Sequence, residues 1–320
     1  MTVWTLPLLW LLSTTTAPTT TAPTPAPSTT TTTAPTTTPA PVLAAKTPSS
    51  SVLPAEAKDS RWPALETRYS NDQPEEGRRE AKALLAQHPD DVELHVLYAR
   101  FLYELGERHK RDDAFDKLGL YTEMVTVLTR ARRLAPGDAR VGWGLGIAKA
   151  RLGTTQGVLS SLSMAREIET LWLQAATSDI HYVSLSGEEN LPCDAYLTLG
   201  IFYRLIPDWW IVEVMAGTRG NVDKALLWLE KAKACAPEAV RVHKELGVGL
   251  LCAAERKGDA SLVTAARRHF SHGLSMTPRF HTERLDHSDM KRLMTQTGDA
   301  CGYSRDGQQT LDESTLADPR

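Results

Sequence analysis

Small, large and proline residues recur at helical spacing in the C-terminal half of the chain. Positions three and four residues apart share one face of a helix, so each recurrence marks a helix with one packed face and a proline just beyond its end. Such a helix cannot bury its apolar face alone, and several helical hairpins must therefore stack into an all-α solenoid. The two clearest recurrences are Ala225, Leu229, Ala232, Pro237 and Ala266, Phe270, Gly273, Pro278.

Each of these segments has a matching first helix upstream. A glycine on the packed face of the first helix lets its partner helix approach closely. The sequence therefore predicts two well-defined helical hairpins. Their first helices carry Tyr196, Leu199, Gly200, Tyr203 and His243, Leu246, Gly247, Leu250.

Earlier repeats are weaker but keep the spacing. Pro89 and Pro136 each stand where a second helix ends, and a polar turn follows each of them. These signals predict half a repeat before Pro89 and two further hairpins after it. The half repeat holds Gly77, Ala81, Leu84; one hairpin pairs His95, Tyr98, Ala99, Leu102 with Met124, Leu128, Ala131; the other pairs Leu145, Gly146 with Val158, Leu162, Ala165.

This pattern resembles the tetratricopeptide repeat, in which a large residue, Leu-Gly and Tyr on the first helix face Ala, a bulky residue, Ala and a closing Pro on the second. The resemblance covers Pro74 to Leu293. The segment Gly142 to Ile168 also resembles a divergent bacterial branch, related to the regulator of microtubule dynamics family and to the periplasmic repeat subunit of tripartite solute transporters. The resemblance implies a repeat domain over 61–296 that serves as a scaffold.

The chain ahead of the repeats differs in composition. Residues 13–41 contain only Ser, Thr, Ala and Pro, and they cannot bury enough apolar area to offset the entropy of ordering. We therefore expect a disordered linker over 13–60, and composition favours a simple linker over an O-glycosylated stalk. A disordered tail is expected over 297–320.

Residues 1–12 include the apolar stretch Val3 to Leu12, which is about half as long as a bilayer-spanning helix requires. It fits the apolar part of a secretory signal, yet the first basic residue is Lys46 and Pro18 follows the first suitable cleavage residue, Ala17. Export to the periplasm or cell envelope is slightly favoured over a cytoplasmic location. A retained stub would instead give weak membrane association.

Charge and motifs exclude several functions. A formal net charge of −3 gives no field that would gather nucleic acid, so no nucleic-acid partner is expected. The chain has no phosphate-binding glycine loop, HExxH or GxSxG, and we expect no cofactor, no metal and no enzymatic activity. His269 and His272 are interpreted as a solvated pair, and Asp286 and Asp289 as acids that stabilise the start of the last helix.

The cysteines are Cys193, Cys235, Cys252 and Cys301, and none has metal-ligand spacing. Free buried thiols are favoured over disulfides, because unpaired cysteines commonly act as small apolar residues. A bridge between Cys235 and Cys252 is geometrically conceivable, since each stands at the end of a predicted helix.

Two insertions lengthen turns of the repeat pattern. Between Tyr203 and Ala225 lies an apolar segment that includes Trp209 and Trp210. It is expected to fold back either as a lid over the concave groove or as a plug inside the superhelix. The segment Glu104 to Leu120 is charged and is interpreted as a solvated helix extension.

Candidate binding residues lie one turn from the packing positions of the first helices, where they face the concave side. Several are arginines, whose forked guanidinium binds carboxylates, so an acidic peptide or a small carboxylate is a suitable ligand. The alternative is that these polar residues line a solvated face. Together with the insertion, the set is Arg100, Tyr103, Arg140, Trp143, Arg204, Trp209, Trp210, Arg241 and Lys244.

Two functions remain open. The first is a noncatalytic scaffold that binds a protein or peptide partner in its concave groove. The second is a ligand-binding accessory of a transport system, with a pocket closed by the Trp209 and Trp210 insertion. A microtubule-associated role ranks below both, because the chain shows no strongly basic surface for an acidic polymer.

Overall fold

The computed structural model of the chain describes residues 61–109 and 116–308. The predicted stub at 1–12, the linker at 13–60 and the last part of the predicted tail, 309–320, lie outside the described residues. Within the described part, no helix is both long enough and apolar enough to cross a membrane.

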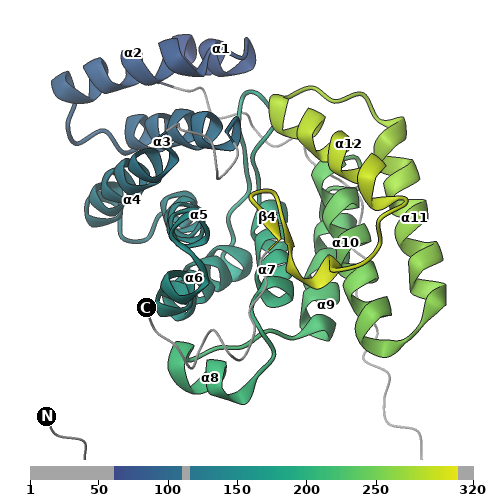
Figure 1. Cartoon of the computed structure of the whole chain (residues 1–320). Helices are drawn as coiled ribbons and strands as arrows, with labels where there is room; N and C mark the ends of the chain where they lie inside the picture. The colour runs from purple at the N-terminus through teal and green to yellow at the C-terminus, as the bar shows by residue number, and fades with distance from the viewer. Residues whose placement is uncertain (1–60, 110–115, 309–320) are drawn as a thin grey trace, which may run out of the picture. The chain divides into compact units, whose positions relative to one another are not determined.

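Most of the described chain is helical (Figure 1). The helices are α1 (Pro63–Ser70), α2 (Pro74–Gln87), α3 (Val92–Glu107), α4 (Lys117–Leu134), α5 (Ala139–Gln156), α6 (Val158–Thr177), α7 (Cys193–Leu205), α8 (Trp210–Ala216), α9 (Val222–Cys235), α10 (Val240–Lys257), α11 (Ala260–Ser275) and α12 (His281–Leu293).

Within these described helices, four hairpins form the array: α3 with α4, α5 with α6, α7 with α9, and α10 with α11. Each also packs on the next along the chain, as in Figure 1, with α1 and α2 before the first hairpin and α12 after the last. The all-α solenoid of tetratricopeptide-like hairpins predicted from the sequence is confirmed. Pro89, Pro136, Pro237 and Pro278 each follow the end of α2, α4, α9 or α11.

Glycines on the first helices allow the close packing that the pattern predicts. A Cβ atom at Gly247 would lie 2.3 Å from Cε1 of Phe270 on the partner helix. At Gly200 the same atom would lie 2.5 Å from Cγ of Leu229. Both contacts join the two helices of one hairpin, so these glycines set the distance between α7 and α9 and between α10 and α11.

Side-chain caps fix the start of several helices. Asp91 accepts a hydrogen bond from the amide of Leu94 at α3, and Asn221 accepts one from the amide of Lys224 at α9. Such caps satisfy amide groups that have no partner inside the helix. The polar turn after Pro89 therefore starts α3 as well as ends α2.

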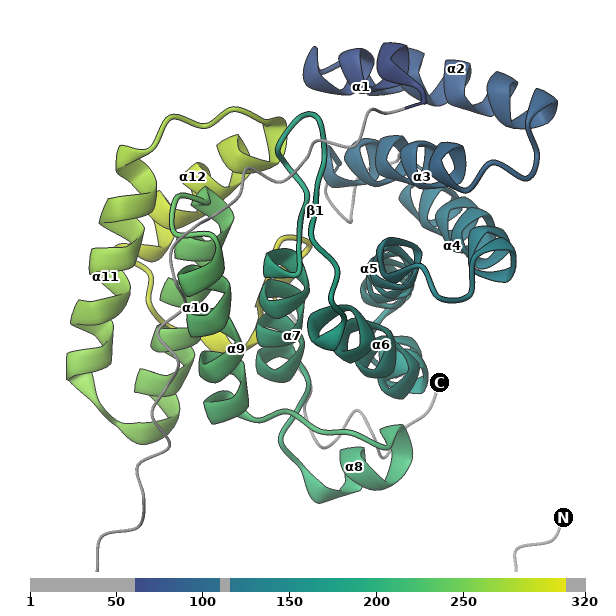
Figure 2. The ribbon, with the colours of Figure 1, turned by 180° about the vertical axis from the view of Figure 1, so that it is seen from behind.

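The strands in the described residues form two short antiparallel hairpins. One pairs β1 (Tyr182–Val183) with β2 (Asn190–Leu191), and the other pairs β3 (Tyr303–Ser304) with β4 (Gly307–Gln308). The first extends from the α6–α7 connection toward α1 and α12 (Figure 2). Its tip joins those helices, because Glu188 accepts hydrogen bonds from Tyr69 and Thr282.

The predicted tail begins too early. Residues 297–308 are ordered and include the 3₁₀-helix η1 (Ala300–Gly302) and the β3–β4 hairpin, whose Tyr303 is buried. We call residues 300–308 the C-terminal segment. Figure 1 shows it folded against α7 and α10. This stretch has no apolar periodicity that would reveal its order in the sequence. Ion pairs and a disulfide hold it in place instead.

The preference for free thiols is also wrong. Cys193 of α7 is bonded to Cys235 of α9, and Cys252 of α10 is bonded to Cys301 of η1. The first bond joins the two helices of one hairpin, and the second attaches the C-terminal segment to the array. Cys235 and Cys252, the pair that the sequence made conceivable, bind different partners.

The insertion forms α8, which packs on α6 through the buried side chains of Val212 and Ala216. Trp210, Val214 and Met215 remain 71%, 73% and 60% exposed. A lid or a plug would bury these apolar side chains, so both expectations are wrong for this face of α8. α8 lies at one end of the hairpins in Figure 1 and borders none of the cavities described below, and of the insertion only Ile206 and Pro207 contribute to a cavity wall.

Candidate functional site

The first helices of the hairpins, α3, α5, α7 and α10, line a common interior, and three cavities border it in the part of the chain that the structure describes. The α3–α5 cavity lies between these helices and the β1–β2 hairpin. The α6–α7 cavity lies between α5, α6 and α7 on one side and α10 and the C-terminal segment on the other. The α12 cavity lies between α10, α12 and the loop that joins β1 and β2. Their volumes are about 50, 180 and 230 Å³.

Most of the predicted groove residues border these cavities. The α3–α5 cavity is lined by Arg100, Tyr103, Arg140, Trp143 and Arg241. The α6–α7 cavity is lined by Tyr103, Arg204, Arg241 and Lys244. Trp209 and Trp210 border none of the three cavities, because α8 packs on α6 instead.

Trp143 presents an unused hydrogen-bond donor. Its side chain is part of the α3–α5 cavity wall and the residue is only 8% exposed. Nε1 of Trp143 is buried and has no hydrogen-bond partner in the described residues. A buried donor without an acceptor costs about 1–3 kcal/mol, so this position favours an acceptor from outside the chain.

The arginines beside Trp143 are held by the chain's own acids. Arg140 donates to both carboxylate oxygens of Asp138, at 3.2 and 2.7 Å, and lies over the ring of Tyr182. Arg100 is buried and pairs with Glu66 at 2.9 Å and Glu189 at 3.2 Å. These pairs fix the cavity wall rather than leave free cations for a ligand.

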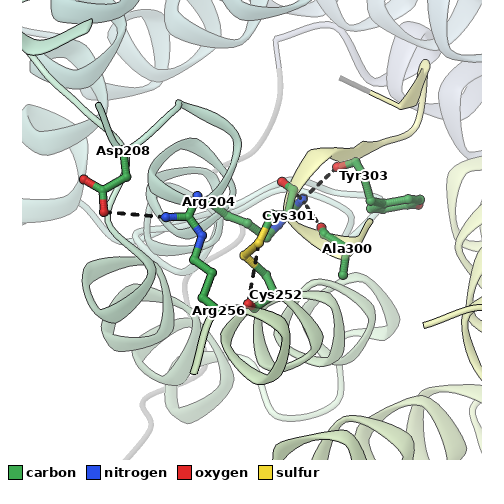
Figure 3. The surroundings of a disulfide bond; sticks show 7 residues. All are labelled: Arg204, Asp208, Cys252, Arg256, Ala300, Cys301 and Tyr303. Atoms are coloured by element: carbon green, nitrogen blue, oxygen red, sulfur yellow. Dashed lines mark hydrogen bonds and ion pairs between the residues drawn. A yellow bond between two sulfur atoms is a disulfide. The ribbon is translucent and has the colours of Figure 1, made fainter. Parts of the chain in front are cut away.

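Arg204 binds the C-terminal segment (Figure 3). Its Nη1 donates to the carbonyl oxygens of Ala300, Cys301 and Tyr303 at 3.0, 3.1 and 2.8 Å. Its Nη2 lies 3.2 Å from a carboxylate oxygen of Glu245. Figure 3 shows the Cys252–Cys301 disulfide beside these bonds. The predicted anion-binding arginine therefore has a structural role in which backbone carbonyls take the place of a ligand.

The sequence missed a group of buried charges around the C-terminal segment. Glu107 forms ion pairs with Arg151 of α5 and Arg305 of the segment. Asp306 forms ion pairs with Lys117 of α4 and with Arg151. The interpretation of Glu104 to Leu120 as a solvated extension is wrong at Glu107, because this residue is buried in the group.

Asp286 is the second acid that the sequence misplaced. It lies in the middle of α12, is fully buried, and pairs with Lys244 at 3.0 Å and with Arg305 at 2.7 Å. Burial alone would raise its pKa, but the two cations lower the pKa to about 2. Its role is therefore an internal ion pair and not stabilisation of a helix start.

Arg241 differs from the other interior cations. It borders all three cavities, and its ion pair within the described residues is a 3.8 Å contact between Nη2 and a carboxylate oxygen of Asp194. Its side chain donates no hydrogen bond to the described part of the chain. Arg241 is thus the interior guanidinium best placed to bind an added anion.

Tyr69 joins two carboxyl groups at the edge of the α3–α5 cavity. Its hydroxyl contacts Glu104 at 3.2 Å and also contacts Glu188. Burial raises the pKa of both Glu104 and Glu188 to about 7. The hydroxyl has one proton, so it can donate to only one of the two carboxyl groups at a time.

Three histidines gather where α10 packs on α11, and the predicted solvated pair is part of this group. Nδ1 of His243 lies 3.2 Å from Nδ1 of His269, and Nε2 of His243 lies 2.7 Å from the carbonyl oxygen of Pro237. The rings of His243 and His272 are 4.4 Å apart between centroids. In residues 61–109 and 116–308, no group of histidines, cysteines and acids is arranged to hold a metal ion.

No protein-family model matches the sequence, and no curated protein matches it. Among solved structures, the chain is similar to TTC0263, a thermophilic tetratricopeptide repeat protein of Thermus thermophilus. The identity is 18% and the TM-score 0.39, over 58% of this chain and 78% of that one. For MamA the values are 18% and 0.35, over 67% and 87%.

The chain is also similar to the human IFIT1 dimer with m7Gppp-AAAA. The identity is 18% and the TM-score 0.46, over 71% of this chain and 44% of that one. This chain therefore spans less than half of IFIT1. All three likenesses concern the arrangement of helices alone, and no residue of the site is assigned from them.

Proposed function

We propose that the protein is a noncatalytic scaffold whose inner wall binds an extended segment of a partner protein. The proposal rests on the buried, unpartnered Nε1 of Trp143, a residue that lines the α3–α5 cavity. At about 50 Å³ the cavity has room for one group of a bound peptide, such as a backbone carbonyl that accepts this hydrogen bond. The neighbouring rings of Tyr103 and Tyr182 supply the apolar contact that peptide-binding grooves use.

The alternative, a transport accessory with a pocket closed by Trp209 and Trp210, lacks this kind of support, because α8 lies away from the cavities. Within the tetratricopeptide class we propose the divergent branch that Gly142 to Ile168 resembles. We also propose export, since two disulfides are typical of proteins that fold in an oxidising compartment.

The test is peptide binding by the full chain, measured on an array of partner-derived or random peptides. Trp143→Phe keeps an aromatic ring but removes the donor. It should lower peptide affinity about fivefold, which corresponds to the loss of one hydrogen bond of about 1 kcal/mol. Trp228→Phe is the matched control, because Trp228 stacks on Tyr196 outside the α3–α5 cavity. Equal peptide affinity of the wild type and Trp143→Phe would show that the donor takes no part in peptide binding.

A further inference from the structure

The α6–α7 cavity has one apolar wall. Its volume is about 180 Å³, and the side chains of α5, α6 and α7 that border it are mainly aliphatic and aromatic. Cavities lined by such residues stay free of ordered water and accept apolar molecules. The wall includes Ile147, Leu162, Ile168, Trp172, Ile201 and Phe202.

The charged wall includes side chains of α5 and α7 as well as of α10 and the C-terminal segment, and cations predominate on it. Arg151, Arg204, Arg241, Lys244 and Arg305 border the cavity, together with the acids Glu107 and Glu245. The remaining acids that pair with these cations are Asp194, Asp286 and Asp306, and none of them borders this cavity. In the pairs with these three aspartates only the cation borders the cavity, so five cations face it against two acids.

Several donors of this wall are unused. Nε of Arg204 and Nε of Arg151 are buried and have no hydrogen-bond partner in the described residues. Arg241 makes only the 3.8 Å contact with Asp194 there. Hydrogen bonds to an ionised acceptor are about twice as strong as neutral ones, so an anion would gain most from these donors.

We propose that the α6–α7 cavity binds a small organic acid, with its carboxylate on the guanidinium of Arg241 and its apolar body against α5, α6 and α7. The cavity is smaller than the roughly 300–1,000 Å³ of sites for drug-sized ligands, so the body is a short hydrocarbon chain or a single ring. This site goes beyond the proposed function, which uses Trp143 and the α3–α5 cavity.

The test is calorimetric titration of the full chain with octanoate and with octanol, which have the same chain length and differ in charge. Octanoate should bind at one site, and octanol should bind at least tenfold more weakly. Arg241→Gln should weaken octanoate tenfold or more and leave octanol unchanged. Arg241→Lys keeps the charge without the fork and should give an intermediate loss, and it provides a second variant if the first does not fold.

Two controls separate the site from the rest of the molecule. Arg267→Gln removes an exposed arginine of α11 and should leave octanoate binding at the wild-type level. Ala150→Phe fills the apolar side of the cavity and should abolish octanoate binding, whereas Ala83→Phe on the exposed side of α2 should not.

The proposal is overturned if octanoate does not bind, if octanol binds equally well, or if Ala150→Phe leaves octanoate affinity unchanged. Peptide binding measured on the same variants keeps the two proposals apart. Trp143→Phe should leave octanoate binding intact, and Ala150→Phe should leave peptide binding intact. Because each variant should affect only one kind of binding, a failed result for octanoate or for peptides identifies which of the two proposals is wrong.

Discussion

Arg305 donates a hydrogen bond of 2.7 Å to Asp286, which joins the C-terminal segment to α12 in the interior of the array. The same guanidinium donates a bond of 2.7 Å to Glu107 of α3. All three residues have side chains at most 12% exposed. A single arginine from the C-terminal segment therefore links the first hairpin of the array to the last helix.

Removing the carboxylate of Asp286 should lower the free energy of unfolding. Asp286→Asn leaves Lys244 and Arg305 without a shared carboxylate, and breaking a buried pair in this way costs about 3–5 kcal/mol. We expect that loss in the free energy of unfolding measured in urea. Asp223→Asn, which removes an exposed pair with Lys257, should cost less than about 1 kcal/mol. Similar effects of the two changes would contradict a special role for Asp286.

The carboxylate of Asp286 should also make the stability of the chain depend on pH in acid. The pKa of Asp286 is about 2 in the folded chain, below its value of about 4 when unfolded. The stability that it contributes is therefore complete above about pH 4 and is lost as the pH falls toward 2. Unfolding measured between pH 5 and 2 should be steeper with pH for the wild type than for Asp286→Asn.

The histidine group should make the stability of the chain depend on pH in a second, higher range. Burial lowers the pKa of His243 and of His269 below the ordinary value of 6.5. The fold therefore favours the neutral rings, so their contribution is complete above about pH 6.5 and is lost as the pH falls through the lowered pKa. His269→Gln should flatten this part of the stability curve, and His181→Gln, at an exposed histidine, should not.

The Cys252–Cys301 bond should both stabilise the chain and hold the C-terminal segment. It closes a stretch of 49 residues, for which loop entropy gives about 4 kcal/mol. The double change Cys252→Ala, Cys301→Ala should lower the free energy of unfolding by that order. Hydrogen exchange at residues 303–307 should also become faster.

The second disulfide is the control for that experiment. Cys193–Cys235 closes a stretch of 42 residues, so its removal should cost a similar free energy. It joins α7 to α9 rather than to the C-terminal segment. If its removal accelerates exchange at residues 303–307 equally, the segment is not held locally by Cys301.

Gly247 should not tolerate even one added carbon. Gly247→Ala places Cβ 2.3 Å from Cε1 of Phe270, and overpacking of this kind typically costs about 1–3 kcal/mol. Gly137→Ala is the control, because a Cβ there has no neighbour within 4 Å. Thermal unfolding should show a lower midpoint for Gly247→Ala alone, and Phe270→Leu in the same chain should recover part of the loss.

The helical hairpins were predictable because their signal is local. Gly200, Gly247 and the prolines that end the second helices follow a spacing set by one helix and its neighbour. The fold class and the four described hairpins required nothing else. Arg100, Tyr103 and Trp143, which the sequence predicted to face the concave side, border a cavity, and their role in binding stays a prediction.

The C-terminal segment could not be predicted from the same signals. Arg305 and Asp306 are polar residues in a short stretch that has no helical period, so they resemble a solvated tail. Their burial depends on acids and cations of α3, α4, α5 and α12, which lie far away in the sequence. The even number of cysteines was the available signal, since Cys301 lies in that stretch.

The C-terminal segment alters how the hairpins melt. In an open solenoid each unit contacts only its neighbours, and the end units fray before the middle. Here Asp306 reaches Lys117 of α4, while Cys301 is bonded to α10. The outer units are thus connected through the interior, and the array should unfold in one cooperative step. A chain shortened at residue 299 would behave as a row of separate hairpins that open one after another.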